Sequence, residues 1–310
     1  MLNRRHLRVK VLQSLYAFYQ SNNDNLAAGE KELLFGIEKI HDLFLYQLSL
    51  LADLLTEEER IIGDNLLKHL PSHEDLHPKR GFLENKCLLM IASNELLKKA
   101  LREKRIGWHN EKELLRKLML TIRDQNYYKT YVSLEDPDFR DDIRFVLTML
   151  NKSILEFEPL HSFYEEKSIY WIDDWELVNK TIIKILKAAS ASQGYLELPE
   201  LYKDATDREF AKELFKRTII NKEEFDQIIS AKTKNWDTER IALMDMIIMQ
   251  MAVTEILKFS DIPVKVSLNE YIELSKMYST PKSNVFVNGV LDKLVEDFTN
   301  QKLISAHTIR

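Results

Sequence analysis

The chain has 310 residues, of which 45% are hydrophobic and 30% charged, and its formal net charge is −5. These values are ordinary for a globular protein with a substantial core, and the acidic balance excludes a polycation that coats nucleic acid without selection. Only 7 glycines and 7 prolines occur, too few for a sheet protein with many tight turns. Long stretches rich in Leu, Lys, Glu and Ile favour helix instead. The composition therefore predicts an all-α fold.

Helical periodicity runs through most of the chain. In the first segment Leu7, Val11 and Leu15 share one apolar face. Further helices are expected at 30–55, 56–70, 83–102, 110–126, 138–155 and 174–190. After a polar linker at 194–207, helices are expected at 207–219, 222–231, 238–259, 264–278 and 284–301.

The most apolar segment is 241–257, which carries Asp245, Gln250 and Glu255. It falls short of the ~20 apolar residues that a membrane span needs, so we expect a buried central helix and no membrane association. The N-terminus lacks the apolar run of a signal peptide. The single cysteine, Cys87, can form neither an internal disulfide nor a zinc site by itself. A cytoplasmic protein with a buried, unreactive thiol is expected.

The N-terminal segment is strongly basic, with Arg4, Arg5, Arg8 and Lys10 within ten residues. Guanidinium groups pair with phosphate in a fork geometry. Arg5 and Tyr16 lie close together on a helical wheel, and such a pair suits an unpaired RNA strand, with phosphate on one and a stacked base on the other. Arg8 projects into the apolar sector, so a salt-bridged structural arginine is its alternative. From charge alone, a solvated N-terminus is the simpler interpretation of the cluster.

A second candidate region opens the last expected helix. Ser283 or Asn284 can cap this helix, which leaves backbone N–H groups free to meet a phosphate. Lys282 would add charge beside them. Gly289 allows close backbone approach in the first turns. Phe286 considered by itself is expected to be a core residue, because phenylalanine side chains are usually buried.

Other polar residues are interpreted as structural. The acidic runs 57–59 and 173–174 are predicted to be helix-terminal charges. Asp245, inside the apolar segment, is expected to pair with a basic group. Asn269 and Glu270 are expected to tie helices together.

One histidine series has metal-ligand spacing on an unbroken helix, but two prolines interrupt it, so a polar loop is expected and a metal site is the alternative. These residues are His69, His73 and His77, interrupted by Pro71 and Pro78.

The C-terminal third resembles the NusB family of transcription antitermination factors. The resemblance rests on the blocks 236–241, 261–270, 273–276 and 286–294, the last reading Phe-Val-Asn-Gly-Val-Leu-Asp-Lys-Leu. The first segment adds a match, since Arg4, Arg5, Arg8 and the run 12–16 look like that family's opening basic helix. Together the matches cover about residues 3–22 and 207–296, the size of a typical family member, so about 25–200 is interpreted as an insertion.

The resemblance implies a NusB-like helical bundle in two subdomains with an extra helical insertion. The implied domains are an N-terminal basic helix at 1–24, the insertion with the N-terminal subdomain at 25–200, and a C-terminal bundle at 201–310. The resemblance also implies binding of the boxA RNA of ribosomal RNA leader transcripts, jointly with the ribosomal protein NusE, and assembly with the RNA polymerase elongation complex. No cofactor is implied.

The family places the aromatic residue that matches Phe286 at the RNA surface, which favours base stacking over the core position. The RNA-binding residues expected are Arg4, Arg5, Arg8, Tyr16, Lys282, Ser283, Asn284 and Phe286.

Two other functions stay open beside this one. The chain could be a NusB-like protein-interaction scaffold with reduced RNA binding, because Gln250 and Val285 stand where the family often has basic residues. An RNA-modifying enzyme is the third, since NusB-like modules also precede methyltransferase domains. No nucleotide-cofactor fold follows and no catalytic constellation appears, so we expect no enzyme. Whether the chain forms a homodimer stays open.

Overall fold

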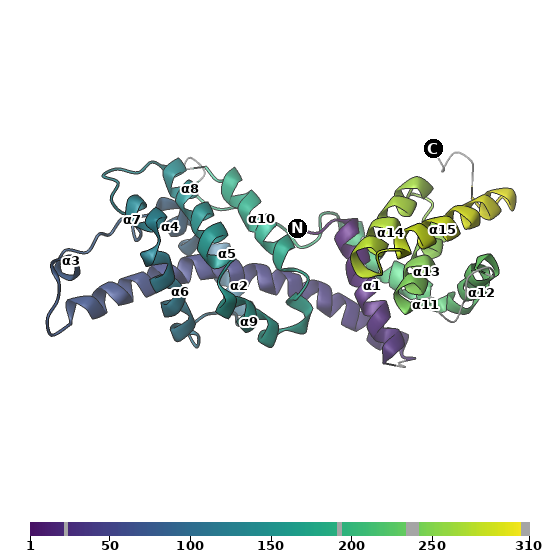
Figure 1. The fold of residues 1–310 in the computed structure, drawn as a ribbon, viewed down its shortest axis with the longest axis horizontal. Coiled ribbons are helices and arrows are strands. Elements are labelled where there is room, and N and C mark those ends of the chain that lie inside the picture. Colours follow the sequence, from purple (N-terminus) through teal and green to yellow (C-terminus); the bar gives the residue numbers. More distant parts are fainter. Residues whose placement is uncertain (22–23, 191–193, 234–241, 305–310) are drawn as a thin grey trace. The chain divides into compact units, whose positions relative to one another are not determined.

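The computed structural model describes residues 1–21, 24–190, 194–233 and 242–304. Within these ranges the chain forms fifteen α-helices, and the one β interaction there is an isolated bridge between Leu2 and Tyr202. The predicted all-α fold is therefore confirmed (Figure 1). The helices group into two compact units: unit 1 with residues 1–37 and 201–310, and unit 2 with residues 38–200.

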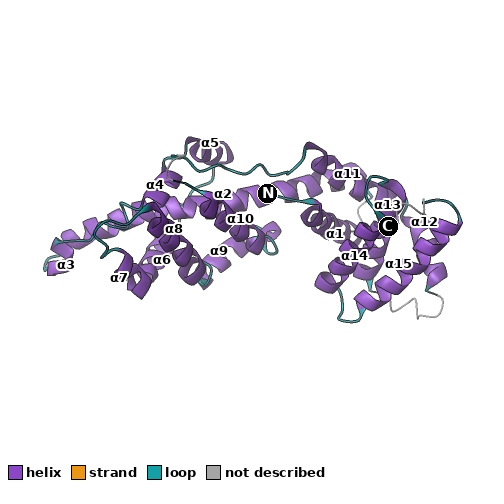
Figure 2. Cartoon of the chain, turned by 90° about the horizontal axis from the view of Figure 1, so that it is seen from above, coloured by secondary structure: helices purple, strands orange, loops and turns teal. Residues whose placement is uncertain are grey.

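Unit 1 is built around one apolar helix. This helix, α13 (Leu243–Lys258), packs against five other helices of unit 1, and every residue from Ile247 to Ile256 is buried (Figure 2). The predicted buried central helix is thus confirmed, although residues 238–241 of the expected segment and the block 236–241 lie outside the described residues. The other helices are α1 (Arg4–Gln20), α11 (Ala205–Ile220), α12 (Lys222–Lys232), α14 (Val264–Tyr278) and α15 (Ser283–Asn300).

Two polar residues of α13 join it to neighbouring helices. The Gln250 side chain donates to Asp226 of α12 at 2.5 Å. The Thr254 hydroxyl donates to the Gln250 carbonyl at 2.8 Å and accepts from the Thr218 hydroxyl of α11 at 3.0 Å. Both side chains are buried, with exposed fractions of 1% and 0%. Gln250 is therefore a buried residue that joins α13 to α12 in the core of unit 1.

Unit 2 is dominated by α2 (Leu26–Leu66), a helix of 41 residues that begins within the residues of unit 1. The prediction of two helices meeting at residues 55 and 56 is wrong, and so is the terminal role of the acidic run. Glu57 is 4% exposed and its carboxylate lies 3.8 Å from the Arg116 guanidinium. Glu58 is 1% exposed and its carboxylate lies 3.4 Å from the Arg123 guanidinium. No Gly or Pro stands near residue 55. The helix therefore continues through the acidic run, with Glu57 and Glu58 buried and ion-paired and Glu59 exposed.

Four of the shorter helices of unit 2 begin at a side-chain cap, at Ser72, Asn85, Asn94 and Asp138. The expected helix at 83–102 is two helices, because Asn94 accepts from the Leu97 amide at 3.0 Å and so starts a new one. Asp174 directly precedes α10, which confirms the terminal role of the run 173–174. These helices are α3 (His73–Leu76), α4 (Lys86–Ala92), α5 (Glu95–Lys104), α6 (Lys112–Asp124), α7 (Asn126–Tyr131), α8 (Phe139–Met149), α9 (Glu158–Lys167) and α10 (Trp175–Ala188).

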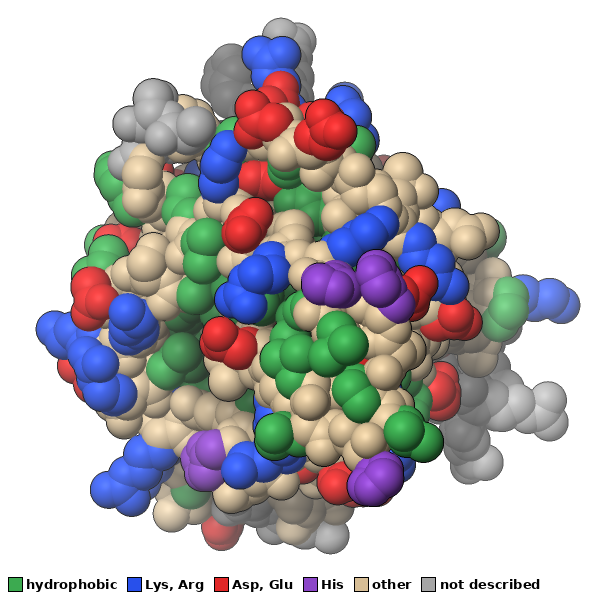
Figure 3. Space-filling model, turned by 90° about the vertical axis from the view of Figure 1, so that its left-hand side faces the viewer, with side chains coloured by type: hydrophobic (Ala, Val, Ile, Leu, Met, Phe, Trp, Pro, Cys, Tyr) green, Lys and Arg blue, Asp and Glu red, His purple; other side chains and the backbone are tan. Residues whose placement is uncertain are grey.

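The segment from the end of α2 through α3 exposes apolar side chains. Leu67 and Leu70 are each 85% exposed, and Leu66 and Leu76 are about half exposed. Figure 3 looks onto this part of unit 2 and shows hydrophobic side chains gathered with histidines at their edge. None of the described helices is both long enough and apolar enough to cross a membrane.

Candidate nucleic-acid interface

The basic start of α1 is organised by a capping box. The Asn3 side chain accepts from the His6 amide at 3.1 Å, and the Asn3 amide donates to His6 Nδ1 at 3.3 Å. No acidic residue stands in the first turn of α1, so Arg4 and Arg5 face the positive end of the helix dipole without local compensation. Carboxylates from other helices supply that compensation.

Arg4 is held between two of these carboxylates. Its guanidinium lies 3.2 Å from Asp261 and 3.5 Å from Asp207, and it stacks over the Phe210 ring at 4.9 Å from the ring centroid. Its side chain is 34% exposed. Arg4 therefore fastens the start of α1 to α11 and to the loop before α14, with part of its surface open to solvent.

Arg5 makes a two-point ion pair with Glu270 of α14. Its Nε and Nη2 atoms donate to the two carboxylate oxygens at 2.8 and 2.6 Å, and this hydrogen bonding lowers the pKa of Glu270. The expectation that Glu270 ties helices together is confirmed, whereas Asn269 is exposed. The Arg5 side chain is 54% exposed. Because a guanidinium carries five N–H donors, Arg5 keeps donors for a phosphate while it stays paired.

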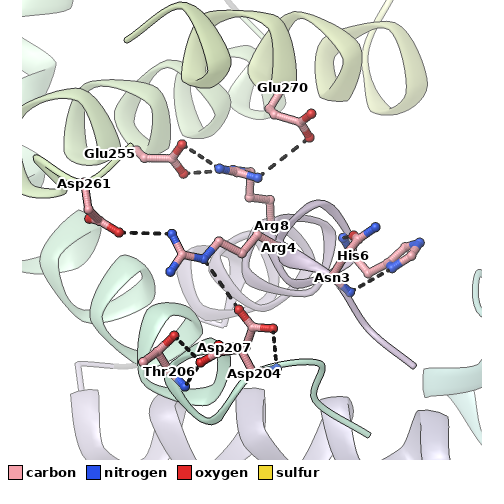
Figure 4. Close-up of polar contacts among 10 residues, drawn as sticks. All are labelled: Asn3, Arg4, His6, Arg8, Asp204, Thr206, Asp207, Glu255, Asp261 and Glu270. Carbon is pink, nitrogen blue, oxygen red and sulfur yellow. Dashed lines mark hydrogen bonds and ion pairs between the residues drawn. The ribbon is translucent and has the colours of Figure 1, made fainter. Parts of the chain in front are cut away.

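Arg8, unlike Arg4 and Arg5, points into the core of unit 1 (Figure 4). It is 3% exposed and donates to both oxygens of Glu255, at 2.8 and 2.7 Å. Glu255 is fully buried and also accepts from the hydroxyl groups of Ser267 at 2.6 Å and Tyr271 at 3.0 Å. Burial lowers the pKa of the Arg8 guanidinium, but the hydrogen bonds to Glu255 and the electrostatic interactions with Tyr271, Glu255 and Glu270 together outweigh burial and raise that pKa above its usual value. The structure thus gives Arg8 the role of a salt-bridged core arginine, the alternative that its apolar sector indicates.

Tyr16 lies farther along α1 and is 39% exposed, with its hydroxyl accepting from Gln20 at 3.3 Å. Its position eleven residues beyond Arg5 corresponds to about 16 Å along a helix axis. The two side chains therefore cannot contact the same nucleotide, and a strand that touched both would have to run along α1.

The start of α15 differs from the predicted cap. The helix begins at Ser283, Lys282 is its N-cap, and no side chain caps it. The Ser283 hydroxyl instead donates to Asp245 of α13 at 2.8 Å, and its side chain is 2% exposed. The expected basic partner of Asp245 is therefore replaced by this serine. The capping prediction is wrong for both Ser283 and Asn284.

The Ser283 amide donates to the Thr280 carbonyl at 2.9 Å, and the absence of a side-chain cap leaves the amides of Asn284 and Val285 suited to an anion. Lys282 is exposed, and Asn284 and Phe286 are each half-buried. Val285 between them is 73% exposed. The space beside Gly289 is open, with no heavy atom of another part of the described structure within 4 Å of the position that a Cβ would take, and the close approach that this glycine allows stays a prediction. The start of α15 is thus a partly open surface with one aromatic ring and one ammonium group.

The two candidate regions are anchored near opposite ends of α13. Ser283 bonds to Asp245 in the first turn of that helix, and Arg8 bonds to Glu255 in its last turn. The ten residues from 245 to 255 correspond to about 15 Å of helix. RNA contact by the eight predicted residues stays a prediction, and burial removes Arg8 and Ser283 from the surface on which it rests.

The histidine series of unit 2 does not assemble a metal centre in the described part of the chain. The rings of His73 and His77 lie 4.6 Å apart between centroids, at the two ends of α3. No group of three or more His, Cys, Asp or Glu side chains that could hold an ion occurs among the described residues.

Unit 1 is an all-helical unit with a capped, basic first helix and a partly aromatic helix start that is open to solvent. Comparison with known proteins adds the family. The NusB family model matches residues 170–296. A transcription antitermination protein NusB from Salinibacter ruber is 44% identical over 114 residues, which cover 37% of this chain and 71% of that protein.

Shorter stretches match two further relatives with the same name. The protein from Trichlorobacter lovleyi is 46% identical over 87 residues, covering 28% of this chain and 61% of that protein. The protein from Natranaerobius thermophilus is 37% identical over 86 residues, covering 28% of this chain and 62% of that protein. No solved structure matches. The chain belongs to the NusB family, and these relatives support a role in transcription antitermination.

Sequence reasoning missed the partners of the arginines. Glu255 was available as a signal, because it is a carboxylate within the most apolar segment and Arg8 is a cation within an apolar sector. Two such residues in one core must pair or be neutralised. The sequence carried no comparable signal for Asp207 and Asp261, which lie more than 200 residues from Arg4.

Proposed function

We propose that this protein is a cytoplasmic antitermination factor that binds the single-stranded boxA element of ribosomal RNA leader transcripts. It binds together with NusE, and the complex joins the RNA polymerase elongation complex. In this proposal the chain is a binding module and not an enzyme.

The observation that carries the proposal is the exposed half of Arg5. Its ion pair with Glu270 fixes the orientation of the guanidinium, while 54% of the side chain stays accessible. A fixed, exposed guanidinium is suited to a phosphate oxygen, because little conformational entropy is lost on binding. Family membership gives this geometry its nucleic-acid interpretation.

The proposed RNA surface has two parts. Arg5 and Tyr16 supply a phosphate contact and a stacking face on α1, and Lys282, Asn284 and Phe286 supply the same pair of chemistries at the start of α15. Arg4 orients α1 and contributes charge from its exposed part. Arg8 and Ser283 hold the helices that carry this surface.

The test is equilibrium binding of the full chain to labelled boxA RNA and to a scrambled RNA of equal length, with and without NusE, at near-physiological salt. Tighter binding of boxA than of the scrambled RNA, strengthened by NusE, is the expected result. Equal and weak binding of both RNAs in the presence of NusE would reject the proposal. Arg5→Glu should weaken boxA binding, whereas Arg208→Glu, on the neighbouring helix α11, is the charge-matched control.

A second candidate function is favoured by the exposed leucines of unit 2. Leu67 and Leu70 are more exposed than expected for apolar residues of a monomeric surface. A scaffold that binds another protein through unit 2 fits this feature. If unit 2 is such a scaffold, replacing both Leu67 and Leu70 with serine abolishes binding of the protein partner and leaves the affinity for boxA RNA unchanged.

A further inference from the structure

Unit 2 contains a small cavity with aromatic walls. It has a volume of about 90 Å³ and is lined by His161, Tyr164, Glu165, Trp171, Ile172 and Trp175. These residues come from α9, from the turn that follows it and from the start of α10. Four of the six lining side chains are rings, and no Lys or Arg side chain lines the cavity.

The rings that line the cavity are inclined to one another. His161 and Trp175 have ring centroids 4.9 Å apart at an interplanar angle of 56°, and Tyr164 and Trp175 are 5.1 Å apart at 50°. Tyr164 and Trp171 are 5.8 Å apart at 77°. At these separations neighbouring rings pack against one another, so the cavity is lined by the ring surface that these contacts leave uncovered, and Tyr164 and Trp171 are 3% and 4% exposed.

The polar edges of three rings are already used by the protein. The Tyr164 hydroxyl donates to Gln47 at 2.9 Å, and the Trp171 indole donates to the Lys39 carbonyl at 2.7 Å. His161 Nε2 lies 2.7 Å from the Leu155 carbonyl, so this nitrogen carries the proton and points away as a donor. These bonds leave ring surface, the Trp175 indole and the exposed carboxylate of Glu165 as the chemistry offered to a ligand.

The segment that forms the cavity is rich in acidic residues. Residues 156–176 contain seven acidic residues and one lysine, Lys167, and one of the seven, Glu176, is paired with Lys180 at 2.5 Å. The Lys167 ammonium lies 5.2 Å from the Tyr46 ring centroid and 5.0 Å from that of Phe163, two rings that do not line the cavity. The aromatic cluster of unit 2 thus already holds one cation against its rings, at a place other than the cavity.

We propose that this cavity binds the cationic head of a basic side chain, an arginine or a lysine carried by a polypeptide partner. Ring faces attract a cation electrostatically, and tryptophan does so most strongly. A guanidinium also stacks flat on an indole, so arginine is the preferred occupant. Glu165 supplies the counter-charge at the rim, and the exposed Ile172 contacts the alkyl stem of the ligand. This site is independent of the RNA surface in unit 1.

The test uses the full chain labelled with 5-fluorotryptophan and fluorine NMR. Signals of Trp171 and Trp175 are assigned with the variants Trp171→Phe and Trp175→Phe, and Trp108, which does not line the cavity, is the internal reference. The probes are blocked arginine, blocked lysine and blocked citrulline, the last being a neutral isostere of arginine, followed by a short arginine-containing peptide. The signals of Trp171 and Trp175 should shift and saturate with the arginine and lysine probes, at concentrations about tenfold below those at which citrulline acts.

A matched pair of variants separates the cavity from general acidity. Glu165→Gln removes a carboxylate that lines the cavity, and Glu166→Gln removes its neighbour, which does not. We expect Glu165→Gln to weaken arginine binding about two- to fivefold and Glu166→Gln by less than about 1.5-fold. Equal action of citrulline and arginine, equal weakening by the two variants, or unshifted Trp171 and Trp175 signals at saturating arginine would each overturn the proposal.

Discussion

Replacing Arg8 with methionine should strongly destabilise unit 1. Arg8 and Glu255 are 3% and 0% exposed and share two hydrogen bonds of 2.8 and 2.7 Å. Arg8→Met keeps an apolar side chain of similar length but leaves the Glu255 carboxylate buried without its counter-charge. Removal of one partner from a buried ion pair costs about 3–5 kcal/mol.

The remaining hydrogen bonds reduce this cost. Glu255 still accepts from Ser267 and Tyr271 in the variant, so we expect the lower part of the range, about 3–4 kcal/mol. Such a loss is a large part of the ~5–15 kcal/mol that typically stabilises a domain. The double variant Arg8→Met/Glu255→Met should recover part of the loss, because it removes the unpaired charge. Recovery stays incomplete, since the Ser267 and Tyr271 hydroxyl groups then lose their acceptor.

Hydrogen exchange measured by mass spectrometry on peptides from α13 reports the stability of unit 1 without assuming that the whole chain unfolds in one step. Protection of α13 should fall by about two to three powers of ten in Arg8→Met, since 1.4 kcal/mol corresponds to a factor of ten. Lys276→Met is the control, because Lys276 forms an exposed pair with Glu273 and should cost less than about 1 kcal/mol. If Arg8→Met and Lys276→Met had equal effects, the assignment of Arg8 to the core would be refuted.

Three further predictions concern unit 2. Burial raises the pKa of Asp53 from 3.8 to about 6. Between these pH values the folded state binds more protons than the unfolded state, so the stability of the protein falls as pH rises through them. Asp53→Asn should therefore raise the melting temperature at about pH 7 and leave it unchanged below about pH 4. Burial raises the pKa of the Cys87 thiol to about 12, so a thiol reagent at about pH 8 should label Cys87 only in the unfolded chain, and rapid labelling of the native protein would contradict its burial. Glu58 accepts from the Tyr128 hydroxyl at 2.8 Å, so in urea denaturation Glu58→Gln should lower the free energy of unfolding by ~1–3 kcal/mol and Glu59→Gln by less than ~0.5 kcal/mol.

The sequence predicted helices well where their ends depend on nearby residues. The last two helices agree with the expected ranges to within one residue, because Pro263 and the polar loop around Pro281 mark their starts. The prediction failed where distant residues decide. The helix at 26–66 continues through its acidic run because partners from α6 neutralise Glu57 and Glu58.

The polar residues at the start of α15 show the same limit. Ser283 was expected to cap a helix and Asp245 to meet a base, and the two side chains instead bond to each other. Each expectation was reasonable for its own segment. Because 38 residues separate the pair, no local pattern connects them. Pairing between helices can satisfy a polar group that local rules assign elsewhere.

RNA recognition itself could not be predicted from charge or periodicity. Arg4, Arg5 and Arg8 all pair with carboxylates in the structure, so basic composition does not by itself mark a nucleic-acid surface. The interpretation of Phe286 as a stacking residue comes from the family resemblance. That role and the domain division at residues 24 and 200 stay predictions.

The most direct test of the RNA-binding surface is the dissociation constant of the Phe286→Ala variant for boxA RNA, measured beside wild type. Base stacking on an aromatic side chain contributes ~1–3 kcal/mol, so affinity should fall about 5- to 150-fold. Tyr195→Ala, which removes an aromatic ring that is 56% exposed in unit 2, is the control and should bind as wild type does. Unchanged affinity of Phe286→Ala, with the variant folded, would show that the start of α15 is not the RNA surface.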